Sequence, residues 1–172
     1  WLGLNWDEKP ISQKIRINRH REIVEILLKS GMAYKCYSTQ QEIKEFRDCA
    51  SKAGKSTLFR SPWRDYSSNK KNKSFVVRLR APTEGLTKIN DAIKGSVEWK
   101  NKTLDDLILL RADGTPTYML AVVVDDFDME ITHVIRGDDH LTNTARQLLI
   151  YHAVGWKAPT FGHLPLIHGA DG

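Results

Sequence analysis

An arginine, a glycine and two aspartates stand between an apolar segment and an amphipathic one in the stretch VIRGDDHLTNTARQ, residues 134–147. A guanidinium presents parallel N–H donors, so Arg136 suits a carboxylate or phosphate group of a ligand. Gly137 allows a tight turn, and Asp138 and Asp139 stand where a helix begins, a place that favours carboxylates. Two interpretations of these aspartates stay open on the residues alone: they bind a polar ligand, or they only cap the next helix.

Other signals for chemistry are weaker. The run Asp138–His140 is a candidate metal corner, but a minor alternative, because the six histidines of the chain do not cluster at ligand spacing. The residues AGKS at 53–56 resemble a phosphate-binding loop, but that motif needs a glycine where Cys49 stands and a buried strand before it. We therefore expect neither a metal site nor a phosphate-binding loop of this type.

Alternating elements surround the candidate site. Apolar patterns predict strands within 104–110, 131–137 and 161–167, and a helix at 142–154 that ends before a glycine. Residues 115–129 are ambiguous, because the valines favour a strand whereas the Thr-Pro pair favours a helix start. This alternation predicts an α/β fold with a parallel sheet, in which ligands bind beyond the carboxyl ends of the strands.

The preceding part of the chain has a different pattern. Helical spacing predicts one helix at 19–30, with Asn18 as a candidate cap, and another at 39–50. Thr39 and Glu42 have the spacing of a capping box at the start of the second helix. Short strands are expected at 34–38, 75–80 and 95–99.

A basic, serine-rich stretch at 51–73 is predicted to be a loop. Mixtures of basic and aromatic residues can bind RNA ends through phosphate contacts and base stacking. We weigh that function equally with a plain solvated loop. The candidate RNA-binding residues are Arg60, Arg64, Lys70, Lys71 and Lys73, with Trp63 beside them.

Composition and charge are those of an ordinary globular protein. Of the 172 residues, 41% are hydrophobic and 27% are charged, and the net charge of +5 permits a polyanionic partner without requiring one. No apolar run approaches the ~20 residues that span a bilayer, so no membrane association is expected. Cys36 and Cys49 form no disulfide framework, and no signal-peptide pattern opens the chain, which together predict a cytoplasmic location.

Longer motifs carry a family resemblance. Residues 113–156, DGTPTYMLAVVVDDFDMEITHVIRGDDHLTNTARQLLIYHAVGW, and 161–172, FGHLPLIHGADG, closely resemble bacterial glutamyl-tRNA synthetases, and most of all the alphaproteobacterial members. The likeness extends to the segments FRSPWRD, FVVRLRAP, LDDLILL and WLGLNWDE. It therefore covers nearly the whole chain and is densest over 104–172.

The resemblance implies the fold of a class I aminoacyl-tRNA synthetase. Such enzymes have a Rossmann-type catalytic domain that is split by an inserted α+β domain, which contacts the tRNA acceptor stem. On this division, the first Rossmann half ends with residues 1–33, and the insertion comprises residues 34–104. The second Rossmann half comprises residues 105–172 and contains a helix at 116–128. Family members that bind zinc use paired cysteines in the insertion, and Cys36 has no such partner, so no zinc is expected.

The resemblance also implies ligand-binding roles. In such enzymes the tyrosine of the PTY segment and the arginine of the VIR segment hold the glutamate substrate, and these residues are Tyr118 and Arg136 here. Asp139 and Ile167 match positions that lie against ATP. Met119 stands where many relatives carry a polar residue, so contacts with the amino acid on that side are expected to differ.

The implied activity is that of a glutamate–tRNA ligase, which activates L-glutamate with ATP and Mg²⁺ and transfers it to the 3′ end of tRNA. The family's His-Ile-Gly-His-type motif would precede residue 1, and its Lys-Leu-Ser-Lys-Arg-type loop would follow residue 172. We therefore expect a fragment, inactive alone, of a longer monomeric protein. Three alternatives stay open: a freestanding nucleotide- or RNA-binding module, a paralogue that charges tRNA-Gln or modifies a tRNA base, and a metal-dependent hydrolase.

Overall fold

The computed structural model describes residues 2–3, 5–6, 8–66, 73–167 and 169. Its helices are the α-helices α1 Ile17–Lys29, α2 Gln40–Lys52, α3 Tyr118–Asp128 and α4 Leu141–Val154, and the short 3₁₀ helices η1 Gln13–Arg16, η2 Pro62–Arg64, η3 Asn101–Thr103 and η4 Asp138–His140. Its strands are β1 Ala33–Cys36, β2 Val76–Leu79, β3 Leu86–Asp91, β4 Gly95–Lys100, β5 Ile108–Leu110, β6 His133–Gly137 and β7 Thr160–Leu164.

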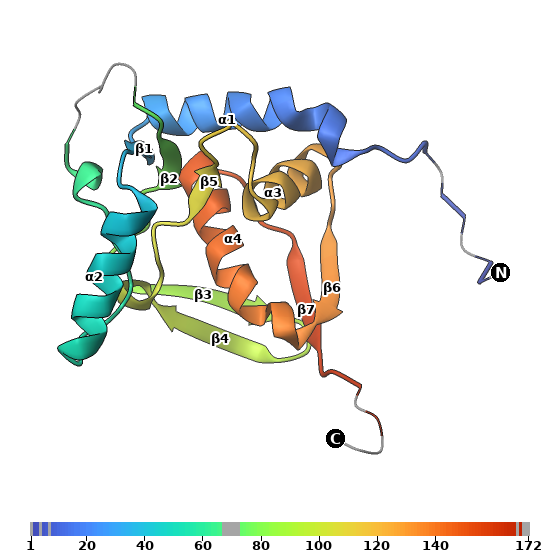
Figure 1. Cartoon of the computed structure of the whole chain (residues 1–172). Coiled ribbons are helices and arrows are strands. Elements are labelled where there is room, and N and C mark those ends of the chain that lie inside the picture. Colours follow the sequence, from blue (N-terminus) through green and yellow to red (C-terminus); the bar gives the residue numbers. More distant parts are fainter. Residues whose placement is uncertain (1, 4, 7, 67–72, 168, 170–172) are drawn as a thin grey trace.

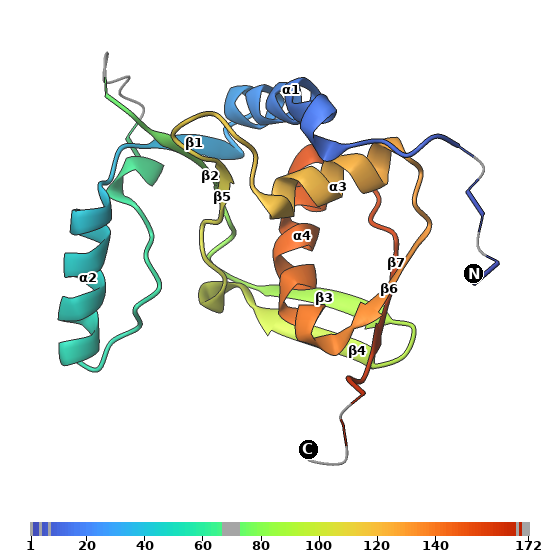
Figure 2. The same ribbon diagram turned by 45° about the vertical axis from the view of Figure 1, so that its right-hand side comes forward.

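Within the described residues the strands form three small sheets. β1, β2 and β5 make an antiparallel sheet, β3 and β4 make a hairpin, and β6 and β7 pair in parallel. The connection between the two parallel strands contains α4, as a parallel crossover requires. Figures 1 and 2 show α2 on one side of the molecule and the β6–β7 pair on the other, with α4 between them.

The core forms where α1, α3 and α4 meet the sheets. Its members are apolar side chains that are at most 5% exposed, among them Val24, Leu27, Leu109, Leu120, Val123, Val124, Ile150 and Phe161. Burying a side chain of this size contributes roughly 1.5–3 kcal/mol. The core therefore joins α1 to the two later helices and holds the parallel strands in place.

A buried polar contact also fastens α1 to α3. His20 and Asp125 are at most 5% exposed, and the Nε2 atom of His20 lies 2.8 Å from Oδ1 of Asp125. The same carboxylate oxygen accepts a hydrogen bond from Nε of Arg16 at 2.6 Å. Because a buried carboxylate needs such partners, these contacts fix how α3 lies against α1.

Several helix predictions are confirmed. The capping box at the start of α2 is present, with Thr39 accepting from the backbone of Glu42 and Glu42 accepting from the backbone of Thr39. The segment 116–128, which was ambiguous on its residues alone, is helical from Tyr118 onward. α4 ends at Gly155, whose φ of 74° is the left-handed conformation expected of a C-terminal glycine.

Other predictions of local structure are wrong. Asn18 is not a cap, because η1 precedes α1 and the side chain of Ser12 accepts from the backbone of Lys14 there. The strand β3 was not predicted, since it contains mostly polar residues; it pairs with β4 in a hairpin. β5 does not join the parallel sheet; it pairs antiparallel with β2. That pairing connects segments on both sides of the boundary predicted at 104/105.

Candidate ligand-binding site at the end of β6

Arg136 lies near the carboxyl end of β6, directly opposite His163 on β7. Its Nε donates to Nε2 of His163 at 3.2 Å, and its Nη2 donates to two side chains of α4, Thr144 at 2.7 Å and Gln147 at 2.8 Å. The guanidinium also lies over the ring of Phe161, 5.5 Å from its centre. The arginine is therefore held on several sides, as a residue that must present a donor in one direction requires.

The structure brings Tyr118 close to Arg136. Tyr118 is the first residue of α3, and the chain leads from α3 into β6. A hydrogen bond with Tyr118 is among the interactions that stabilise the charged form of Arg136. Tyr118 is 48% exposed, so its ring stays accessible beside the guanidinium. The two predicted glutamate-binding residues are thus neighbours.

The charges around Arg136 oppose one another. Burial lowers the pKa of Arg136, while the nearby groups of Tyr118, Asp126 and Asp139 act in the opposite direction. Burial also raises the pKa of Asp126, and Arg136 counteracts that shift. A partly desolvated guanidinium attracts an anionic ligand more strongly than one in open water. The arrangement suits the binding of a carboxylate.

The two aspartates after Gly137 do not cap α4. The helix begins after His140, and no side chain forms a capping hydrogen bond there. Asp138 instead accepts from Nζ of Lys94 on the β3–β4 hairpin at 2.7 Å, and this hydrogen bond lowers the pKa of Asp138. The side chain of Asp139 is 52% exposed and lies against the backbone of Gly137. The capping interpretation is therefore wrong, and Asp139 stays accessible to a ligand.

The second residue predicted to lie against ATP, Ile167, follows β7 by three residues. Its side chain is fully exposed, with a relative exposure of 101%. Exposure of a large apolar side chain to this degree is compatible with contact to a ligand or another segment. Its role in ATP binding stays a prediction.

The described residues contain neither a metal-binding cluster nor a helix that could span a membrane. No group of three or more histidine, cysteine, aspartate or glutamate side chains among them is arranged to hold a metal ion. None of the helices in the part of the chain that the structure describes has the length and hydrophobicity to cross a membrane. Asp138 is engaged with Lys94, and the metal-corner alternative therefore gains no support.

The predicted RNA-binding arginines make contacts inside the protein. Arg60 donates to the carbonyl oxygens of Asn101 and Leu104 at 3.2 and 3.0 Å. Arg64 donates to the carboxylate of Asp106 at 2.6 Å and to the carbonyl of Ala81 at 2.7 Å. Both guanidinium groups thus hold this segment against the antiparallel sheet.

An aromatic groove lies beside these arginines. It has a volume of about 620 Å³ and is lined by Ser38, Glu42, Phe46, Phe59, Arg60, Pro62, Trp63 and Tyr66. Lys73 is exposed, whereas Lys70 and Lys71 lie outside the described residues. The groove therefore combines aromatic rings with one arginine, Arg60, and one glutamate, Glu42, and its role in RNA binding stays a prediction.

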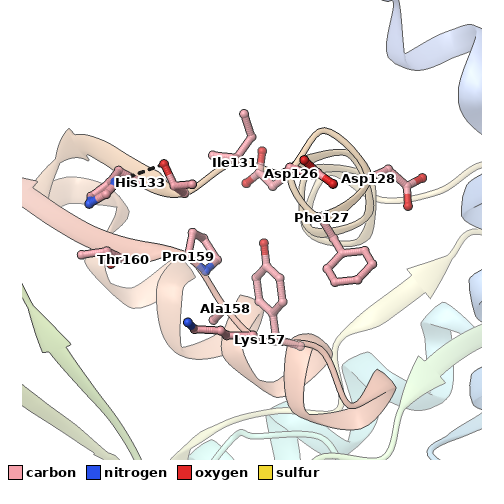
Figure 3. Close-up of a pocket in the computed structure, with 12 residues that line it drawn as sticks. Asp126, Phe127, Asp128, Ile131, His133, Lys157, Ala158, Pro159 and Thr160 are labelled. Atoms are coloured by element: carbon pink, nitrogen blue, oxygen red, sulfur yellow. Dashed lines mark hydrogen bonds between the residues drawn. The ribbon is translucent and has the colours of Figure 1, made fainter.

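A second cavity lies at the other end of the parallel strands. It has a volume of about 630 Å³ and is bordered by the first residues of β6 and β7, His133 and Thr160. Figure 3 shows the last turn of α3, with Asp126 and Phe127, on one side and residues 157–160 on the other. Ligands of parallel sheets bind beyond the carboxyl ends of the strands, so we assign the candidate site to the end that carries Arg136.

Four residues of the site were not predicted from the sequence. Thr144, Gln147, His163 and Asp91 surround Arg136 or its histidine partner, and all four are at most 4% exposed. The i, i+3 spacing of Thr144 and Gln147 on the predicted helix could have placed both on one face. No local signal relates Asp91 to His163, which lie 72 residues apart.

Comparisons with known proteins agree with this picture. The whole chain, residues 1–172, matches the model of the family "tRNA synthetases class I (E and Q), catalytic domain". It is 60% identical to the glutamate–tRNA ligase of Phenylobacterium zucineum and 57% identical to glutamate–tRNA ligase 1 of Cereibacter sphaeroides strain ATCC 17023. Each match covers 100% of this chain, and the chain spans only 36% and 37% of those two relatives.

Solved structures show the same relationship. The glutamate tRNA ligase from Elizabethkingia meningosepticum, crystallised in complex with its amino acid, is similar with a TM-score of 0.86 and 32% identity. That match covers 97% of this chain and 38% of the other. The glutamate-tRNA synthetase from Elizabethkingia anophelis has a TM-score of 0.87, with 32% identity over 100% of this chain and 39% of that one. The chain belongs to the class I tRNA synthetases of the E and Q group, within their catalytic domain.

Proposed function

We propose that this chain is the part of a glutamate–tRNA ligase that holds the amino acid and one side of the nucleotide. The observation that carries the proposal is the Tyr118–Arg136 pair at the carboxyl end of β6, in a chain of this family. The partly buried guanidinium of Arg136 binds a carboxylate of L-glutamate, and Tyr118 contacts the amino acid beside it. Asp139 and Ile167 lie against ATP.

The reaction needs positioned groups more than a protein nucleophile. A carboxylate of glutamate attacks the α-phosphate of ATP, which is bound with Mg²⁺, so that glutamyl-adenylate forms and pyrophosphate leaves. A hydroxyl of the terminal ribose of the tRNA then attacks the acyl carbon of the adenylate, so that the ester forms and AMP leaves. Arg136 contributes by holding a carboxylate of the amino acid equally in the ground and transition states of the first step, which lowers KM for glutamate.

For the tRNA partner, we propose that residues 34–104 form the inserted domain and that its aromatic groove lies next to the acceptor stem. Trp63 and Tyr66 supply rings for stacking, while Lys73 supplies an exposed cation. On this proposal Arg60, which also lines the groove, takes part beside these rings. On this proposal Arg64 supports the RNA-binding segment from inside through Asp106.

The experiment is ATP–pyrophosphate exchange by the full-length protein with glutamate and tRNA present. Arg136→Ala should lower kcat/KM for glutamate by about 10- to 100-fold, the value of a hydrogen bond to a charged group. Arg146→Ala is the matched control, because Arg146 lies on α4 and pairs with Asp105. Exchange that does not depend on glutamate, or that is unchanged in Arg136→Ala, would contradict the proposal. Charging of purified tRNA-Gln in place of tRNA-Glu would identify a paralogue.

A further inference from the structure

A chain of buried hydrogen bonds connects the β3–β4 hairpin to Arg136 through His163. Asp91, the last residue of β3, lies with its Oδ2 atom 2.6 Å from Nδ1 of His163, and its Oδ1 atom accepts from the backbone N–H of His163 at 3.1 Å. On the other side of the imidazole, Nε2 accepts from Nε of Arg136 at 3.2 Å. The side chains of Asp91 and His163 are fully buried.

The contact between His163 and Arg136 sets the arrangement of protons. A guanidinium only donates, so Nε2 of His163 must accept from Arg136, and the ring proton is on Nδ1, where it is donated to Asp91. The hydroxyl of Thr144 accepts from Nη2 of Arg136 at 2.7 Å and lies 3.0 Å from Nε2 of His163, so it shares the single lone pair of that nitrogen with Nε–H of Arg136. The orientation of Arg136 thus depends on the tautomer of His163.

Asp91 is itself held in a fixed position. Its Oδ1 atom also accepts from the backbone N–H groups of Ile93 and Lys94, at 3.0 and 2.9 Å, which closes the hairpin turn. Burial raises the pKa of Asp91, but the hydrogen bonds from Lys94, His163 and Ile93 outweigh burial and hold that pKa well below its usual range. The carboxylate is therefore charged and immobile beside His163.

We propose that Asp91 and His163 are positioning residues for Arg136. Asp91 selects the tautomer of His163, and that tautomer fixes Nε of Arg136. The hydrogen bonds of Arg136 to His163, Thr144 and Gln147 use Nε and Nη2, so none of these three residues holds Nη1, which on this proposal meets the carboxylate of the ligand beside Tyr118. The inference rests on the proposed role of Arg136 in binding glutamate and adds two residues to it.

Two substitutions break this chain at different points and keep the remaining contacts. In Asp91→Asn, the amide oxygen still accepts the three backbone N–H groups, so the amide NH₂ faces Nδ1 of His163 and imposes the opposite tautomer. Nε2–H then meets Nε–H of Arg136, two donors in opposition. In His163→Asn, the amide nitrogen can still donate to Asp91, but the acceptor for Arg136 is lost.

The test is exchange kinetics of the full-length protein with glutamate and ATP varied separately. Both variants should raise KM for glutamate about tenfold or more and leave KM for ATP and kcat within about twofold, because Arg136 contributes to binding in the ground and transition states alike. Specific ¹⁵N labelling of histidine should also show that His163 changes from the Nδ1–H to the Nε2–H tautomer in Asp91→Asn.

Thr87→Val is the structural control. Thr87 donates to Asn101 at 2.6 Å inside the hairpin base, far along β3 from Asp91. It should lower the melting temperature with little change in KM for glutamate. Equal increases of KM for glutamate in Thr87→Val and Asp91→Asn would overturn the inference. So would a KM for glutamate within twofold of wild type in both Asp91→Asn and His163→Asn. If Arg136→Ala itself leaves KM for glutamate unchanged, the proposed function is what fails.

Discussion

The buried carboxylate of Asp106 should be one of the main polar determinants of stability in the antiparallel sheet. It is fully buried and accepts hydrogen bonds from Nη1 of Arg64 at 2.6 Å, the hydroxyl of Tyr34 at 2.8 Å and the backbone N–H of Ala81 at 3.0 Å. These donors come from three separate segments. Asp106→Ala removes all three acceptor contacts and leaves the guanidinium of Arg64 without its counter-charge.

The loss of unfolding free energy in Asp106→Ala can be estimated from these contacts. Breaking a buried ion pair costs about 3–5 kcal/mol. Arg64 is 15% exposed and keeps the carbonyl of Ala81 as an acceptor, so the lower end applies, about 3 kcal/mol. Asp106→Asn should cost less, about 1–2 kcal/mol, because its oxygen still accepts from Arg64 and the Tyr34 hydroxyl can turn to accept an amide proton.

Tyr34 keeps its proton in the wild type, so wild type and the Asp106 variants can be compared without a change in the charge of Tyr34. Burial, followed by the negative charge of Asp106, raises the pKa of Tyr34 far above its usual range. The hydroxyl is therefore a donor throughout the accessible pH range, and the Asp106 variants are not complicated by ionisation of Tyr34.

Urea denaturation of the protein, followed by circular dichroism and tryptophan fluorescence, measures these free energies. A double-mutant cycle with Arg64→Met isolates the ion pair, and we expect a coupling energy of about 1–3 kcal/mol with unchanged m-values. A coupling energy under about 0.5 kcal/mol, or a loss under about 1 kcal/mol in Asp106→Ala, would refute the argument that this carboxylate joins the three segments.

Two further predictions concern acid stability and the nucleotide. The hydrogen bond from Arg19 lowers the pKa of Asp128. Their pair therefore stabilises the fold above the unfolded-state pKa of about 3.9, and this contribution is lost as pH falls through the lower folded-state pKa. The melting-temperature difference between wild type and Asp128→Asn should be constant near neutral pH and shrink below about pH 4, and a difference that grows in acid would contradict the lowered pKa. In Gly137→Ala, the new Cβ would lie 2.5 Å from Oδ1 of Asp139, so the exposed carboxylate must move; KM for ATP should rise severalfold with KM for glutamate nearly unchanged, and an unchanged KM for ATP would remove Asp139 from the nucleotide site.

Local signals in the sequence were sufficient for much of the helical structure. The capping box at Thr39 and Glu42 and the glycine at 155 act within one turn of a helix, so residue type and spacing predict them without knowledge of the fold. The family resemblance, and not periodicity, decided that 116–128 is a helix and that Tyr118 belongs with Arg136. Helix caps and family motifs can both be recognised from residues that are close to one another in the sequence.

Long-range pairing was decided only by the tertiary structure. β5 has an apolar pattern that suits a parallel or an antiparallel partner equally, and its pairing with β2 depends on how the two segments meet in the core. Arg60 and Arg64 had the composition of an RNA-binding stretch, but the carbonyls and the carboxylate that accept from them come from distant residues. A basic residue in a sequence does not reveal whether an internal acceptor is present.

The surroundings of Arg136 show the same division most clearly. Its type and its place after an apolar strand predicted a carboxylate-binding arginine, because guanidinium chemistry is a property of the residue itself. Its orientation depends on His163, and through His163 on Asp91, at a sequence separation of 72 residues. The sequence by itself determined which group could bind the ligand. Only the folded chain, by bringing β3 against β7, determined the direction in which that group points.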